Sequence, residues 1–398
     1  MSSRSRFSGS LRSFFVLLAL SAASSGAAQS KEMTVEWKDG LRFESPDSEV
    51  YLKLGGRILN DWAWFPERSD ASVSTSDATE FRRARIYLAG KLGGGLIFKS
   101  QIDFSSGEVA FKDMYMGIED LPVVGELRVG QMKEPFSLEE LTSSNYITFM
   151  ERSPAAAFDA ERNTGIMVQN GWSNQRVLAS LGIFRNTDET GSGSGDARYN
   201  YSARLSGLPY EDTEHHRLIH LGIAGSLRKT PDGMYQMSIR PSSHLTDKIL
   251  HSDVLMAKEY SLAGFEAAAA IGPFSVDAEY RLTNVNVIGG DNPNLTGFYL
   301  AGSWFLTGEN RPYNHFEGAF GRVKPIKPLG SGPGAWELAV RIAHVDLSEA
   351  NGGQLDDYTA GINWYANNNA RVMLNFVYSD ANENGQFSGL QTRFMVYF

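Results

Sequence analysis

The chain contains no cysteine, so no disulfide can stabilise it. It has no apolar run of the ~20 residues that a membrane-spanning helix needs, and no G-x-S-x-G motif of the hydrolase type. Its 37 basic residues are scattered among 46 acidic ones, which argues against a nucleic-acid partner. These absences exclude a disulfide-stapled domain and a helical membrane protein, and they offer no sign of an enzyme.

Two further patterns resemble sites but do not predict one. His216 and His220 are four residues apart, which in a strand separates them by ~13 Å, too far to share one metal ion. We interpret both as solvent-facing. The glycine-rich stretch at 191–196 precedes no helix, so we expect a loop and not a phosphate cradle. The sequence thus predicts no catalytic residue, no cofactor and no metal site.

The N-terminus has the organisation of an export signal. An apolar run at 14–23 is about half the length needed to span a membrane, and small residues allow cleavage after Ala28. It follows a basic stretch with three arginines, Arg4, Arg6 and Arg12. We expect a signal peptide over 1–28, whose removal changes the formal net charge from −9 to −12 because it carries these arginines and no acid.

Residues 29–49 are expected to form a periplasmic N-terminal segment. It holds two short strand-like pieces, TVEW and LRFE, around a turn at Lys38, Asp39 and Gly40. The pattern leaves two alternatives open, namely a periplasmic hairpin or an arm that reaches a neighbouring subunit.

From residue 50 to the C-terminus, apolar and polar residues alternate with the period of two that marks strands. In the first strand the polar face carries Lys53, Arg57 and Asp61, and the apolar face ends in Trp62 and Trp64. A soluble sandwich would also have one charged face. However, the number of such strands, with aromatic residues near their ends, favours lipid outside and water inside.

The strand count predicts the architecture. Up-strands are expected to begin near residues 50, 95, 126, 176, 217, 274, 334 and 370, and down-strands near 79, 109, 163, 198, 257, 296, 357 and 388. We therefore predict an all-β fold over 50–398, a sixteen-stranded antiparallel transmembrane β-barrel. Most long connections then fall on one rim, at 66–78, 133–162, 187–197 and 229–256. A strand-like piece within 307–335 would be an odd seventeenth strand, so we expect it outside the wall.

The stretch from Glu126 to Asn163 leaves strand periodicity for nearly thirty residues, and a loop this long is usually functional. It interleaves apolar residues that need packing partners with polar ones, including Lys133, Arg152 and Arg162. We interpret it as a loop folded into the barrel. A sixteen-stranded barrel leaves an aqueous channel, and such a loop would form its constriction.

Inward basic residues predict a preference for anions, because rings of Arg and Lys suit anions and phosphate. The candidates are Arg57, Arg82, Arg83, Arg85, Lys99, Lys133 and Arg152, with Ser143 and Ser144 as hydroxyl donors. Strict alternation would turn Arg82 towards lipid unless it lies at the rim or beside a bulge. A single arginine is better explained by a structural pair with Asp61, Asp103, Asp113 or Glu139, but the cluster favours a functional role.

Nine stretches carry a resemblance to a known family. They are LGGRI, FRRARIYL, FKDMYMGIED, VGQMKEPFSLEELTSS, FMERSP, LTGE, GAFGRVKP, GAWELAVRI and GINWYANNNARVMLNFVY, followed by the terminal Phe398. In this order, from about Leu52 to the end, the chain resembles the phosphate-selective porins of the O and P type. The resemblance implies a homotrimer in the outer membrane of a Gram-negative bacterium, with passive diffusion of phosphate or other small anions.

The resemblance also implies site residues. A central anion site would comprise Arg57, Arg82, Arg83, Asp113, Ser143, Ser144 and Arg152, and an entrance would be lined by Arg228, Lys229 and Arg240. One position departs from the family, because Glu140 stands where the family's loop has a lysine. A carboxylate there would repel anions if it faced the lumen. Two alternatives therefore stay open: a barrel with weak or different selectivity, for polyphosphate, organic acids or cations, and a plugged structural barrel.

Overall fold

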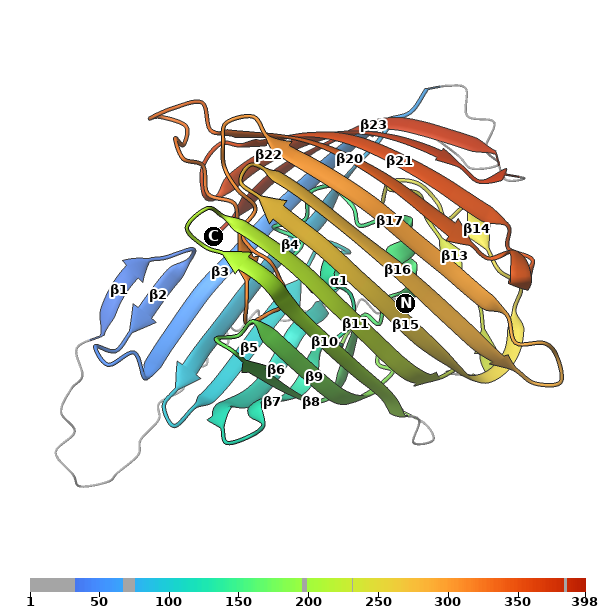
Figure 1. Cartoon of the computed structure of the whole chain (residues 1–398), viewed down its shortest axis with the longest axis horizontal. Coiled ribbons are helices and arrows are strands. Elements are labelled where there is room, and N and C mark those ends of the chain that lie inside the picture. Colours follow the sequence, from blue (N-terminus) through green and yellow to red (C-terminus); the bar gives the residue numbers. More distant parts are fainter. Residues whose placement is uncertain (1–32, 67–75, 195–198, 231, 383–384) are drawn as a thin grey trace, which may run out of the picture. The chain divides into compact units, whose positions relative to one another are not determined.

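The computed structural model describes residues 33–66, 76–194, 199–230, 232–382 and 385–398, so the expected signal peptide lies outside the described residues. In the unit Met33–Phe398, sixteen antiparallel strands close into a barrel (Figure 1). They are β3 (Val50–Trp64), β4 (Ala78–Leu92), β5 (Leu96–Asp103), β6 (Ala110–Leu121), β7 (Gly125–Lys133), β8 (Arg162–Trp172), β9 (Val177–Arg185), β10 (Tyr199–Asp212), β11 (Arg217–Lys229), β15 (Leu255–Ile271), β16 (Phe274–Val287), β17 (Asn294–Phe305), β20 (Ala335–Asp346), β21 (Gln354–Tyr365), β22 (Ala370–Asp380) and β23 (Gln386–Tyr397). The predicted fold class and strand number are confirmed.

The barrel closes where β23 pairs with β3, from Tyr397 opposite Arg57 to Leu390 opposite Trp64. Within the described residues no helix is long and apolar enough to cross a membrane.

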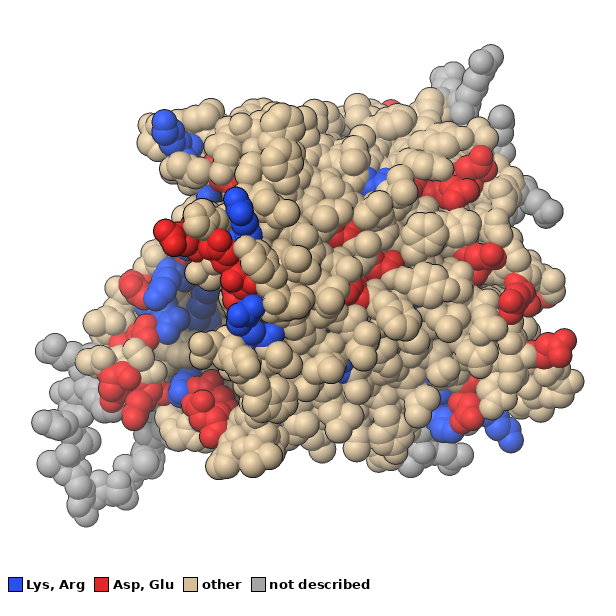
Figure 2. All heavy atoms as spheres, in the orientation of Figure 1, with Lys and Arg blue, Asp and Glu red and all other residues tan. Residues whose placement is uncertain are grey.

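The two faces of the wall differ as the alternation predicts. Outward residues such as Ile58, Ile86 and Val340 are half exposed or more, although all are large and apolar. Inward residues such as Arg281 and Arg393 are fully buried despite their charge. On the face seen in Figure 2, charged side chains gather towards the two ends of the barrel, and other residues dominate the band between them. This apolar band suits the hydrocarbon core of a bilayer.

The connections divide into two rims. Short turns, such as 93–95 and 122–124, lie on the turn rim, where β3 begins and β23 ends. The longer connections lie on the opposite loop rim. One of them carries β12 (Met234–Tyr235), β13 (Ser238–Ile239) and β14 (Leu250–His251), and another the 3₁₀ helix Ser348–Ala350. Residues 232–254 reach β20 and β21, since Ser242 accepts a hydrogen bond from Arg341 at 2.7 Å and donates one to Asp357 at 2.5 Å.

The N-terminal segment forms a hairpin of β1 (Thr34–Trp37) and β2 (Leu41–Glu44). β2 pairs with the start of β3, with Leu41 opposite Leu54. This part of β3 precedes Arg57, where the pairing of β3 with β23 ends. Trp37 stacks on Phe398, with ring centroids 6.1 Å apart. In the described chain this segment therefore extends the wall at the turn rim.

The connection from β17 to β20, residues 306–334, is the exception on the turn rim. Its strands β18 (Tyr313–Asn314) and β19 (Ala319–Phe320) pair only with each other, so this piece is no wall strand, as expected. It lies on the inner side of the wall, however. Arg311 binds Asp277 at 2.5 Å, and Arg204 donates to the Gly318 carbonyl at 2.8 Å.

This inner segment corrects one interpretation. His220 is fully buried, and its ring nitrogens lie 2.8 Å from the Tyr313 hydroxyl and 3.0 Å from Glu266. The expectation that His220 faces solvent is therefore wrong. The sequence of β11 alone could not show that a distant segment covers its inward face.

The pair that closes the barrel gives a stability prediction. Arg393 binds Asp61 through two nitrogens at 2.7 and 2.6 Å, and also Glu151 at 2.7 Å. Removing one member of a buried pair leaves an uncompensated charge. Arg393→Met should therefore lower the free energy of unfolding by about 3–5 kcal/mol, measured by urea titration of the folded protein. The exposed Arg217→Met should change it by less than about 0.5 kcal/mol, and an equal loss in both variants would contradict the prediction.

Candidate anion pathway

Residues 134–161, here called the inner loop, follow the inside of the wall. The loop contains α1 (Leu138–Leu141) and the 3₁₀ helix Pro154–Phe158. Phe149 packs against Tyr299, Ala301 and Ala339, which face inward from β17 and β20. Phe136 packs with Leu262 of β15. The interleaved apolar residues thus find their packing partners on the barrel wall.

Wall arginines hold the backbone of the inner loop. Arg371 donates to the carbonyls of Ile147 and Thr148 at 2.7 and 2.9 Å, and Arg341 donates to that of Glu151 at 3.0 Å. These carbonyls belong to no strand ladder, so each needs another donor when buried. The arginines supply it and fix the path of the loop.

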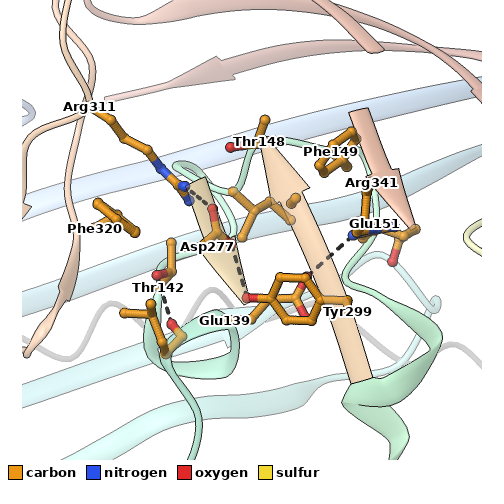
Figure 3. Close-up of a pocket in the computed structure, with 13 residues that line it drawn as sticks. Glu139, Thr142, Thr148, Phe149, Glu151, Asp277, Tyr299, Arg311, Phe320 and Arg341 are labelled. Carbon is orange, nitrogen blue, oxygen red and sulfur yellow. Dashed lines mark hydrogen bonds and ion pairs between the residues drawn. The ribbon is translucent and has the colours of Figure 1, made fainter. Parts of the chain in front are cut away.

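The N-terminal end of α1 is held by a carboxylate of the barrel wall. Glu279 on β16 accepts from the backbone N–H groups of Leu138 and Glu139 at 3.1 and 2.7 Å, where a helix favours a carboxylate. Behind the loop a small cavity of about 20 Å³ lies near Tyr299, Arg311 and Arg341 (Figure 3). At this volume it holds about one water molecule and no solute.

Two larger cavities occupy the lumen. One, of about 630 Å³, lies on the loop-rim side of the inner loop, and the other, of about 580 Å³, lies on the turn-rim side. Arg152 and Arg162 line both. The turn-side cavity is also lined by Arg57, Arg83, Arg85, Lys99, Asp113, Lys133, Ser143 and Ser144. The loop-side cavity is lined by Arg82, Glu140, Arg228 and Arg240. Lys229 instead lines a separate hollow with Tyr199 and Glu259.

The turn-side cavity is strongly basic although the whole chain is acidic. Ten lysines and arginines line it, against three acidic residues, Asp39, Asp113 and Glu317. The anion-site candidates predicted from the sequence did not include four of the ten, Lys53, Arg128, Arg162 and Arg322, although Lys53 was expected on the inward face and Arg162 in the loop. Arg162 begins β8 at the end of the inner loop and binds Asp113 at 2.9 Å. Its place beside the loop was the signal that could have identified it.

Most of the candidate cations have a carboxylate partner. Arg85 binds Asp103 at 2.6 Å, and Lys99 binds Asp113 at 2.5 Å. Of the residues expected at the entrance, Arg228 binds Glu134 at 2.8 Å in the lumen, whereas Lys229 binds Glu259 in the separate hollow and lines neither lumen cavity. These residues therefore fit the structural interpretation, in which a cation pairs with a carboxylate of the protein, and their charge is largely compensated.

Arg82 binds Glu151 through two nitrogens, both at 2.9 Å. The pairing of β3 with β4 shifts here, since Leu59 lies opposite Arg83 and Asn60 opposite Phe81. Arg82 is the extra residue of a β-bulge, so it and its neighbour Arg83 both turn inward.

Arg57 and Arg83 differ from the other candidates. Both are more than nine-tenths buried, and neither has a carboxylate within ion-pair distance among the described residues. Arg57 donates to the Ser144 hydroxyl at 2.6 Å, while its Nε finds no acceptor. Nε and Nη1 of Arg83 also lack acceptors. A buried charge without a partner is costly, so these two guanidinium groups point to an anion that the protein chain does not supply.

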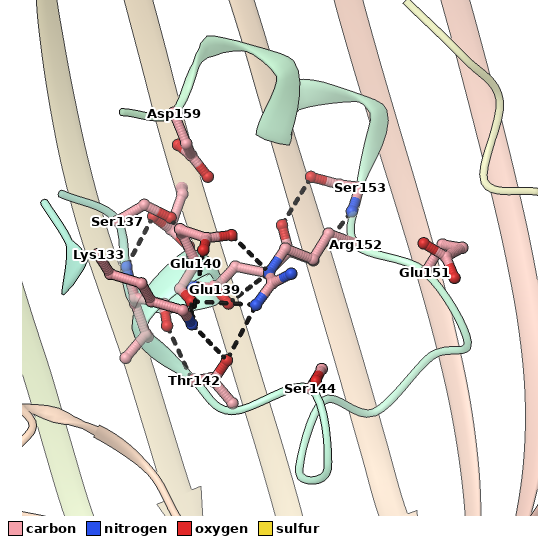
Figure 4. A network of polar contacts seen from close by, with 12 residues as sticks. Lys133, Ser137, Glu139, Glu140, Thr142, Ser144, Glu151, Arg152, Ser153 and Asp159 are labelled. Carbon is pink, nitrogen blue, oxygen red and sulfur yellow. Dashed lines mark hydrogen bonds and ion pairs between the residues drawn. The ribbon is translucent and has the colours of Figure 1, made fainter. Parts of the chain in front are cut away.

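Glu140 of the inner loop lies between two cations, Lys133 at the end of β7 and Arg152 on the loop itself (Figure 4). Its carboxylate oxygens lie 3.5 Å from Nζ of Lys133 and 3.1 Å from Nε of Arg152. Burial alone would raise the pKa of Glu140, but the positive charges of Arg152 and Lys133 outweigh it and lower the pKa to about 2. Glu140 is therefore ionised at neutral pH.

Comparison with known proteins agrees with this geometry. The family model described as phosphate-selective porin O and P matches residues 52–398. Porin O of Pseudomonas aeruginosa is 25% identical over 405 residues, covering 90% of each chain. An uncharacterized protein of Caulobacter vibrioides is 29% identical over 360 residues, which cover 86% of this chain and 71% of that protein.

Solved structures share the fold at low sequence identity. An anion-selective porin from Comamonas acidovorans has a TM-score of 0.58 and 14% identity, covering 88% of this chain and 100% of that one. A trimer form of OmpT from Vibrio cholerae has a TM-score of 0.55 and 9% identity, covering 88% and 99%. With the family model matching the whole barrel, the chain belongs to the phosphate-selective porin O and P family and is a porin of the outer membrane.

Proposed function

We propose that this porin is a passive channel for phosphate or related oxyanions, with Arg57 and Arg83 at the centre of its anion site. The observation that carries the proposal is that both guanidinium groups are buried without a carboxylate partner among the described residues. They line the basic turn-side cavity together with Ser143 and Ser144. The family name and the anion-selective relative of known structure support the same function.

The residue types suit an oxyanion. Arginine presents a planar fork of donors that binds two oxygens at once and stays charged at every relevant pH. Arg162 and Arg152 would attract the anion from both cavities, since they line each of them. Asp113 orients Lys99 and Arg162 from the opposite side. The anion would exchange part of its hydration shell for these donors and move on by diffusion, without covalent chemistry.

A rival function, that of a plugged structural barrel, is supported by a separate observation. The inner loop, residues 232–254 and residues 306–334 all contact the inner wall and so lie within the lumen. This arrangement would also suit a plugged, structural barrel. The folded protein in a planar bilayer distinguishes the two, because a channel gives discrete current steps and a plugged barrel gives none.

We also propose that the protein assembles as a homotrimer, as the OmpT trimer form of Vibrio cholerae does. Native mass spectrometry of the detergent-extracted protein should show three copies. Chemical cross-linking in outer-membrane vesicles gives an independent check, and a monomer in both experiments would contradict the proposal.

Arg83 provides the test of the anion site. Arg83→Ala removes a buried charge that no carboxylate compensates, so the ratio of anion to cation permeability should fall by roughly three- to tenfold. The reversal potential under a chloride gradient measures this ratio. Arg217→Ala removes the same charge from an exposed turn-rim position and should leave the ratio unchanged.

Phosphate titration completes this test. Phosphate should block the chloride current of the wild-type channel and block that of Arg83→Ala more weakly. A cation-selective wild type without phosphate block would remove the proposed function and leave the porin fold intact.

A further inference from the structure

Glu140 places a fixed negative charge within the proposed anion pathway. It is 7% exposed and lines the loop-side cavity with Arg152 and Arg162. Its neighbour Lys133, together with Arg152, also lines the turn-side cavity. A solute that passes between the two cavities therefore passes the cations that Glu140 contacts.

The contacts show what the carboxylate does and does not hold. Lys133 also binds the backbone carbonyl of Glu140, and Arg152 donates to the carbonyls of Glu139, Glu140 and Thr142 at 3.0, 3.0 and 3.1 Å (Figure 4). These bonds fasten both cations to the end of α1, where positive charge is favourable. Because the backbone supplies these acceptors, the position of Lys133 and Arg152 does not depend on the Glu140 carboxylate alone.

The Glu140 carboxylate thus occupies cations that would otherwise be available to a permeating anion. Its ionised form is stabilised by Arg152, Lys133, Arg162 and Arg83, in that order, against the cost of burial. All four line the turn-side cavity. The cations that favour an anion in the pathway are the ones that already favour Glu140.

We propose that Glu140 is a tethered counter-anion: it competes with permeating oxyanions for Arg152 and Lys133 and so sets the channel's anion affinity. This inference rests on the proposed function. With Glu140 in place, an oxyanion is bound mainly by Arg57, Arg83 and Arg162, and it is held more weakly. Weaker binding lets an anion leave sooner, since conduction needs a site that an ion can enter and also leave.

The test uses Glu140→Gln in the full-length folded protein. The amide keeps the shape and an acceptor oxygen for Arg152 but removes the charge. The concentration of sulfate that halves the chloride current should fall by about tenfold relative to the wild type. Inorganic phosphate should show the same direction. Glu214→Gln, an equal charge change at an exposed turn-rim position, should leave the half-blocking concentration unchanged.

A second substitution at the same position adds a second readout. If Glu140→Gln does not fold, Glu140→Ala removes the same charge and should shift the half-blocking concentration in the same direction.

The outcomes separate this inference from the proposed function. Unchanged or weaker sulfate block in the Glu140 variants, with reduced anion preference in Arg83→Ala, would overturn the tethered counter-anion and leave the anion site standing. Absence of anion selectivity in the wild type and in Glu140→Gln alike would overturn both.

Discussion

A buried guanidinium group needs an acceptor, and the interior of this barrel is organised by how each arginine finds one. Arg341, Arg371 and Arg393 find theirs in the carbonyls of the inner loop. The loop in turn leaves strand geometry and has no ladder to satisfy those carbonyls. The two needs are complementary, and together they fix the inner loop along β20, β22 and β23. These hydrogen bonds hold the inner loop against the inner face of the wall.

The same requirement separates arginines whose charge a carboxylate compensates from arginines whose charge stays uncompensated. Arg85, Arg228 and Arg281 satisfy it with carboxylates, so their charge is compensated before any solute arrives. Arg57 and Arg83 do not, although they are buried to a similar degree. Sequence position cannot distinguish these groups, because all five face inward from wall strands. What distinguishes them is the partner that another strand or loop brings, and partners are a property of the folded chain.

Much of the barrel wall could be predicted from the sequence, because the alternation of apolar and polar residues along a strand shows which residues lie on each of its two faces. β5, β16 and β22 begin at Leu96, Phe274 and Ala370, within one residue of the expected positions. The irregularity at Arg82 was also visible, since two adjacent arginines cannot both face inward in a regular strand; of the two expected explanations, a rim position or a bulge, the structure has the bulge. These features depend on a few neighbouring residues.

The contents of the lumen could not be predicted in the same way. Residues 306–334 carry no periodic signal that gives the side of the wall on which they lie, and they bury His220 from a distance of about ninety residues in sequence. Arg162 lies at the first position of β8, where the boundary of a strand and the end of a loop look alike. Glu140 was visible as a departure, but its two cationic partners come from the end of β7 and from the returning part of the loop.

The net charge of the whole chain does not predict the charge of the lumen, because that charge depends on which side chains the fold brings together. A chain with a formal charge of −9 encloses a cavity lined by ten basic and three acidic residues. Charges on the exposed rims are screened over about 8 Å at physiological ionic strength, whereas charges in a narrow, partly desolvated channel are screened much less. The local balance therefore governs which ions enter. In such a channel one carboxylate placed among the cations affects ion selectivity more than many carboxylates on the surface do. The position of Glu140 therefore has a larger effect on selectivity than the excess of acidic residues elsewhere.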